Sequence, residues 1–181
     1  LNAEGQFMPV KSGGSFGDLF GREGEVLLVN GKVLPRLKVR QGKQQRWRVI
    51  NAARTRYYTL RYKRSPLVIV GGDGGLAEHS RTVDEIRIVP GERMDFVFTP
   101  PDVPDSEGML KWYPTDRGYG TTFNRLSEDI MIIETVKDAA VIPEPVPVAL
   151  RTIAPVDVEG ANQREINLTI APTDVVDAYL R

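Results

Sequence analysis

Hydrophobic and polar residues alternate with a period of two over most of the chain before residue 137. In residues 46–49, for example, a tryptophan and a valine share one face while two arginines occupy the other. This alternation predicts β-strands that bury one face, and no segment has the apolar stripe of an amphipathic helix. The expected strands lie at residues 25–31, within 36–51 as two strands joined around Gly42, and at 56–63, 66–70, 83–89, 93–98, 108–114 and 128–136.

The segment from residue 83 to residue 100 predicts a β-hairpin. Ile86 and Ile88 alternate with polar residues before Pro90 and Gly91, a pair that suits the two central positions of a type II turn. Strands separated by turns at such short intervals favour an all-β fold, an antiparallel sandwich or barrel.

The composition changes after Val136. Four prolines between residues 143 and 155 remove backbone donors and favour an extended chain, so this part is interpreted as a linker. The last residues alternate Ile166, Leu168 and Ile170, as the opening strand of another domain would.

Composition and charge narrow the functional classes. Acidic and basic residues balance at 24 each, which disfavours nucleic acid, anionic lipid and acidic substrates as partners. The chain has no cysteine, and no apolar run approaches the roughly 20 residues that span a bilayer. It also begins without methionine and without the apolar stretch of a signal peptide, so we expect a piece of a longer precursor.

The glycine-rich stretch at residues 71–75 has two interpretations. A phosphate-binding loop would need a helix directly after the glycines, but the sequence continues into a strand pattern without a Lys-Ser/Thr pair. We therefore interpret it as a structural turn that delivers the chain into a strand beginning near Arg81. In that turn the Asp73 carboxylate would accept hydrogen bonds from neighbouring backbone N–H groups. The turn residues are Gly72, Asp73, Gly74 and Gly75, together with Pro90 and Gly91 of the second turn.

Other candidate chemistry is weak. His79 is the only histidine, and a type 1 copper centre needs two imidazoles and a thiolate, so no metal ligand set is predicted. A carboxylate-only calcium or magnesium site stays open, although no stretch matches a calcium loop. No G-x-S-x-G motif is present, so no catalytic residue is assigned. The basic and aromatic residues of 46–64 are explained by strands with aromatics inside and arginines outside, rather than by nucleic-acid binding.

The order of several short motifs carries a family resemblance. They are LVNG at 28–31, RVINAARTRYYTL at 48–60, GGDGG at 71–75 and VDEIRIVPGERMDFVF at 83–98. Together they resemble the middle cupredoxin domain of three-domain multicopper oxidases, the laccase and bilirubin oxidase class. The resemblance covers roughly residues 17–136, and the proline-rich linker with its terminal strand is similar to the family's passage into its third domain.

The resemblance implies a copper-free Greek-key β-sandwich of the cupredoxin type, with an extended C-terminal linker. The partners of this domain would be the first and third domains of the parent protein, which would bind the copper. These two domains would oxidise a substrate and reduce O2 to water. The implied location is periplasmic or secreted. The implied divisions are a connecting segment at 1–20, the domain at 21–136, the linker at 137–163 and the first strand of a third domain at 164–181.

The loop at residues 113–127 is a candidate border of a substrate cleft or an interdomain contact, because loops on a rigid sandwich often carry contact residues. The alternative is a plain surface crossing between two strands. Its candidate contact residues are Arg117, Tyr119, Phe123 and Arg125.

Two functions of the parent protein stay open, and a third interpretation of the chain is weaker. The first is the copper oxidase, and the second is a copper-free homologue that acts as a structural or interaction protein of the cell envelope. The third, an independent sugar-binding or hydrolytic sandwich, leaves the order of the motifs unexplained. If the linker normally docks on absent domains, the chain alone would expose apolar surface and unpaired strand edges, so self-association is expected.

Overall fold

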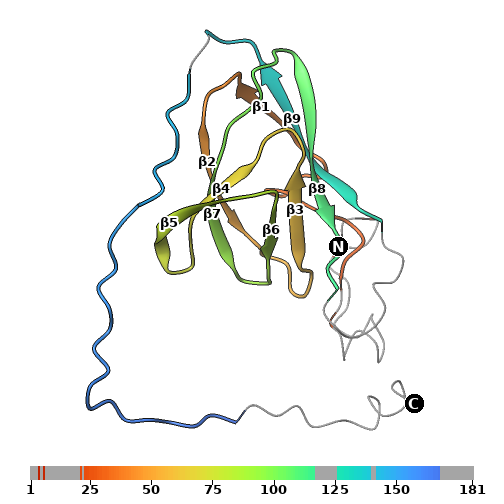
Figure 1. Ribbon diagram of the computed structural model, residues 1–181. Helices are drawn as coiled ribbons and strands as arrows, with labels where there is room; N and C mark the ends of the chain where they lie inside the picture. The colour runs from red at the N-terminus through yellow and green to blue at the C-terminus, as the bar shows by residue number, and fades with distance from the viewer. Residues whose placement is uncertain are drawn as a thin grey trace.

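Within the described part of the chain, nine strands between Arg36 and Val136 form two β-sheets (Figure 1). The structure is a computed structural model, and it describes residues 4, 6, 21, 23–116, 126–139 and 142–167. The strands are β1 (Arg36–Arg40), β2 (Gln45–Ile50), β3 (Tyr58–Tyr62), β4 (Leu67–Gly72), β5 (Gly75–Val83), β6 (Glu85–Ile88), β7 (Arg93–Phe98), β8 (Ser106–Tyr113) and β9 (Glu128–Val136).

The strand order shows that the chain repeatedly crosses between the sheets. One sheet has the order β1-β9-β8-β3-β6 and the other the order β2-β7-β4-β5. Only β4–β5 and β8–β9 are sequential neighbours that pair, and β1 pairs with β9 in parallel. The predicted all-β sandwich is confirmed by this arrangement of two sheets.

Apolar residues from both sheets form the core between them. The Tyr62 ring of β3 meets the Phe98 ring of β7 edge-on at 5.0 Å, and Trp47 of β2 lies 5.0 Å from the same Phe98 ring. Aromatic pairs in tilted or edge-on geometry add to the stability that area burial supplies. The alternating faces of β2, β3 and β7 therefore converge where the sequence pattern placed them.

The hairpin predicted around Pro90 and Gly91 is wrong, although the chain does turn there. The N–H of Glu92 donates to the Val89 carbonyl at 3.0 Å, and Gly91 has φ +83°. However, β6 pairs with β3 and β7 pairs with β2 and β4, so the turn carries the chain from one sheet to the other. Local turn chemistry is the same in both cases, and only the long-range partners differ.

The strand predicted at residues 25–31 is also wrong. Its end forms a tight turn in which Val29 and Lys32 exchange both backbone hydrogen bonds, with positive φ at Asn30 and Gly31. Among the described residues this segment forms only an isolated bridge, between Val29 and Lys32, and belongs to neither sheet. Leu27 nevertheless packs into the core, which explains the apolar run.

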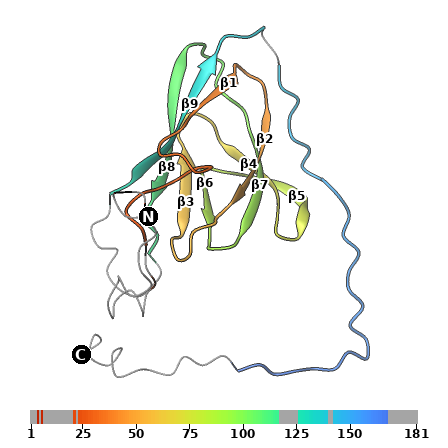
Figure 2. The same cartoon turned by 180° about the vertical axis from the view of Figure 1, so that it is seen from behind.

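After β9 the chain is extended, as expected for a linker. Residues 142–167 contain one isolated bridge and are mostly exposed. In two opposite views this segment passes the β5 side of the sandwich (Figures 1 and 2). Among the described residues no helix is long and apolar enough to cross a membrane.

Candidate functional site

The glycine-rich stretch forms the hairpin turn between β4 and β5. Gly72 pairs with Gly75, so Asp73 and Gly74 are the two loop residues. A strand, β5, follows directly at Gly75, whereas the sequence pattern predicted no strand before about residue 81. The strand expected to begin near Arg81 corresponds to β6, which begins at Glu85. The continuation as a strand leaves no helix N-terminus to receive a phosphate.

The structure brings this turn against the start of β7. The Asp73 Oδ1 atom accepts a hydrogen bond from the Arg93 backbone N–H at 2.9 Å and pairs with Arg93 Nε at 3.0 Å. The carboxylate therefore caps a neighbouring strand rather than its own turn. Because Arg93 follows the Pro90–Gly91 turn, Asp73 ties together the two glycine-containing turns predicted from the sequence.

His79 lies exposed near the middle of β5, beside Ala149 of the linker. The described residues contain no group of three or more histidine, cysteine, aspartate or glutamate side chains that could hold a metal ion. With one histidine and no cysteine in the whole chain, the donor set does not fit any of the family's copper centres.

Glu78 and Ser80 contact the linker, a role that the sequence pattern did not predict. Ser80 donates its backbone N–H to Val148 and its hydroxyl to Pro147, each at 2.8 Å. The Glu78 carbonyl accepts the Leu150 N–H at 2.8 Å. Two polar residues on a sheet edge give no sequence signal for a partner that lies about 70 positions away.

A buried arginine is the main exception to the expected outward orientation of the arginines. Arg56 is 3% exposed and its guanidinium lies 4.5 Å from the centre of the Trp112 ring. It donates to the Gly24 carbonyl and lies 3.6 Å from the Glu23 carboxylate. A desolvated guanidinium needs such partners, so Arg56 anchors residues 23 and 24 to the core.

Asn51 is a second buried polar residue of the motif at residues 48–60, which also contains Arg56. Its Nδ2 atom donates to the carbonyls of Arg56 at 2.8 Å and Ile88 at 3.0 Å, and its Oδ1 atom accepts the Ala53 N–H at 2.9 Å. The three bonds join backbone groups of the connection between β2 and β3 to the last residue of β6. The RVINAARTRYYTL motif is therefore a structural corner in this chain.

The outer face of the four-stranded sheet carries a paired charge cluster. Arg46 binds the Asp95 carboxylate with two nitrogens, and Arg48 Nε lies 3.6 Å from the same group. The hydrogen bond from Arg46 is the main cause that holds the pKa of Asp95 below its ordinary value. Two arginines of the basic strip, Arg46 and Arg48, are thus paired with a carboxylate on the neighbouring strand.

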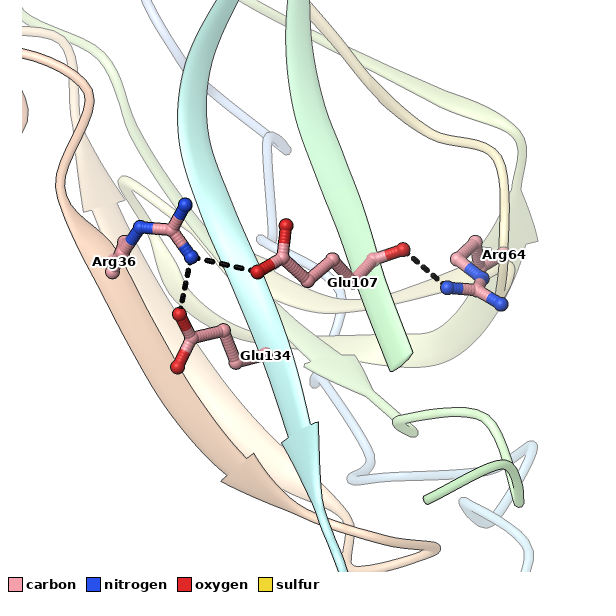
Figure 3. A network of polar contacts seen from close by, with 4 residues as sticks. All are labelled: Arg36, Arg64, Glu107 and Glu134. Atoms are coloured by element: carbon pink, nitrogen blue, oxygen red, sulfur yellow. Dashed lines mark hydrogen bonds and ion pairs between the residues drawn. The ribbon is translucent and has the colours of Figure 1, made fainter. Parts of the chain in front are cut away.

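A second cluster joins three strands of the other sheet (Figure 3). Arg36 of β1 binds Glu107 of β8 at 2.7 Å and Glu134 of β9, while Arg64 donates to the Glu107 carbonyl. Glu107 and Glu134 are directly opposite each other in the β8–β9 ladder. Hydrogen bonds to Glu134 and Glu107 raise the pKa of Arg36. The positive charge of Arg36 offsets the repulsion between the two opposed carboxylates.

The candidate contact loop falls largely outside the described residues. Arg117, Tyr119, Phe123 and Arg125 all lie there. At the described margin, the hydroxyls of Thr59 and Thr115 share a hydrogen bond of 2.7 Å.

Comparison with known proteins gives a consistent family. The family described as multicopper oxidase matches residues 7–108. A laccase from Bacillus subtilis is 41% identical over 76 residues, which cover 41% of this chain and 15% of the laccase. A cell division protein FtsP from Yersinia pestis is 37% identical over 79 residues, covering 43% of this chain and 16% of FtsP.

Solved structures agree with the sequence similarities. A variant of the McoA multicopper oxidase from Aquifex aeolicus is 26% identical with a TM-score of 0.68, over 78% of this chain and 32% of McoA. A multicopper oxidase from Campylobacter jejuni is 27% identical with a TM-score of 0.62, over 78% of this chain and 28% of that protein. This chain thus spans a third or less of these relatives. With the family match covering more than half of the sequence, the chain belongs to the multicopper oxidase family and forms a cupredoxin-type domain of it.

Proposed function

We propose that this chain is the middle domain of a three-domain multicopper oxidase and holds the two copper-bearing domains in register. The donor set supports this proposal: one histidine and no cysteine cannot build a centre of imidazole and thiolate ligands. The copper of the outer domains would supply substrate oxidation and O2 reduction to water. The contribution of this chain is a rigid two-sheet body between the outer domains.

The proposed domain boundaries rest on the family resemblance and on the change of composition after Val136. Residues 21–136 form the domain, 137–163 the linker and 164–181 the first strand of the third domain. The loop residues Arg117, Tyr119, Phe123 and Arg125 border the substrate cleft or an interdomain contact. The parent protein is periplasmic or secreted, as the family resemblance implies.

A second candidate function is favoured by the similarity to FtsP. In this alternative the parent binds no copper and is a structural or interaction protein of the cell envelope. The middle domain would have the same spacer role in both cases, so the two candidates differ only in the flanking chain.

Intact mass and copper content of the protein, purified from its source without proteolysis, test the proposal. A longer species with about four coppers supports the oxidase. A longer species without copper supports the envelope protein instead. An intact mass equal to these 181 residues would overturn the three-domain proposal.

A further inference from the structure

Without a further partner, the four-stranded sheet would have an open edge along the outer side of β5. β5 is the last strand of the four-stranded sheet and is nine residues long. A long edge presents unpaired N–H and C=O groups, which can pair with a strand of another molecule. In this chain, residues 147–153 of the linker, called the strap below, lie along that edge (Figure 1).

The strap pairs with β5 as a short antiparallel strand. Its centre is the bridge between His79 and Ala149. The hydrogen bonds from the Ser80 N–H to Val148 and from the Leu150 N–H to Glu78 flank that bridge. This pattern makes His79 and Ala149 a pair without mutual hydrogen bonds, in which the two Cα atoms approach closely.

Side chains reinforce the same register. The Ser80 hydroxyl donates to the Pro147 carbonyl at 2.8 Å, and the Glu78 Oε1 atom accepts the Ile153 N–H at 3.1 Å. Glu78 and Ser80 therefore each bind the strap through both backbone and side chain. A shift of one residue would break all of these contacts together.

The prolines limit the pairing to this segment. Pro147 begins the strap and Pro155 follows it, and neither can donate a backbone hydrogen bond to a sheet. Prolines also keep the unbound chain extended, so less conformational freedom is lost when the strap docks. Val148 stays 71% exposed and Ile153 47% exposed, which leaves the hydrogen bonds as the main attachment.

We infer that β5 is a strand-acceptor site, that its occupant is the chain's own strap, and that the strap closes this edge against a second copy of the chain. The strap also fixes the point from which the following chain departs. This inference goes beyond the spacer role and concerns this chain alone, so it can fail or hold whatever the copper content of the parent.

Cysteine cross-linking tests the register of the strap. Because the chain has no cysteine, the double variant His79→Cys/Ala149→Cys offers a single possible disulfide within one molecule. We expect it to form within one molecule on mild oxidation of the full chain, detected as a monomer that has lost two hydrogens. The register-shifted control His79→Cys/Leu150→Cys is expected to stay reduced. A cross-link only between copies, or equal cross-linking of both variants, would overturn the inference.

A proline pair tests the closing of the edge. Leu150→Pro removes the N–H that binds Glu78, whereas Ala149→Pro changes the bridge residue, whose own N–H is neither of the two donors. By sedimentation velocity we expect Leu150→Pro to form a larger dimer fraction than the unchanged chain, rising with concentration, and Ala149→Pro to match the unchanged chain. If Leu150→Pro self-associates no more than Ala149→Pro, the strap does not protect the edge.

Discussion

Single residues at the end of β4 decide how closely two strands can approach. A Cβ on Gly71 would lie 2.4 Å from the Gly75 carbonyl oxygen, whereas a Cβ on Gly74 would meet nothing within 4 Å. The ladder register also shifts between Ile69 and Gly71. Gly71 is thus needed for its lack of a side chain, at a point where backbone meets backbone.

This difference predicts unequal effects of two alanine substitutions in one motif. Gly71→Ala forces the β4–β5 turn apart and should lower the free energy of unfolding by about 1–3 kcal/mol. Gly74→Ala, the matched control, should leave it almost unchanged. Urea unfolding of both variants measures this, and equal stabilities would show that the turn adjusts without strain.

The lowered pKa of Asp95 predicts that the stability of the folded chain depends on pH. The pKa of Asp95 in the folded chain is lowered from 3.8, chiefly by the hydrogen bond from Arg46. A lowered pKa means that the folded state favours the ionised form, so the stabilisation is fully present above 3.8 and is lost as the pH falls through the lower folded value. Asp95→Asn should therefore melt at a lower temperature than the unchanged chain at pH 7, and the difference should shrink as the pH falls below 3.8.

Melting temperatures from pH 2 to pH 7 provide the measurement. Asp129→Asn, which removes the partner of Lys111, is the control for losing one surface carboxylate. A difference between Asp95→Asn and the unchanged chain that persists at low pH would show that the carboxylate charge is not its cause.

At the scale of strands, charge pairs fasten the edge of the five-stranded sheet. β1 has a single neighbour, β9, yet Arg36 reaches past it to Glu107 on β8. Without Arg36, the opposed carboxylates of Glu107 and Glu134 would repel each other. One side chain, Arg36, thus links the edge strand β1 to both β9 and β8.

Arg36→Gln should loosen β1 and lower the melting temperature, more strongly at low salt than at high salt because salt screens the carboxylate repulsion. Lys43→Gln removes the same charge from an exposed turn position and serves as the control. Hydrogen exchange of the β1 amides should be faster in Arg36→Gln alone. Identical exchange and melting in both variants at low salt would contradict the role of this cluster.

At the scale of the whole molecule, the two sheets form the rigid body and the linker is only partly attached to it. Arg151 lies within the strap, where its N–H donates to the Glu78 carbonyl at 3.4 Å, whereas Arg164 lies in the exposed segment beyond it. The linker therefore has a bound part and an unbound part.

Trypsin should distinguish these parts, because proteases cleave chain that can leave its neighbours. Brief digestion of the full chain should cut after Arg164 before Arg151, as followed by intact mass. In Leu150→Pro the cut after Arg151 should become faster. Equal early cleavage at both arginines of the unchanged chain would mean that the strap is not bound in solution.

The sequence by itself determined the all-β class, the extended linker and most strand-forming segments from residue 36 to residue 136, because alternation, turn residues and prolines act locally; it did not predict β5. Only the tertiary structure decided which strands pair. It turned the expected hairpin around Pro90 and Gly91 into a crossing between sheets, buried Arg56 against Trp112 and placed Glu78 and Ser80 beside the strap. Each of these depends on groups distant in the sequence, whose backbone and charge pairing carries no local pattern.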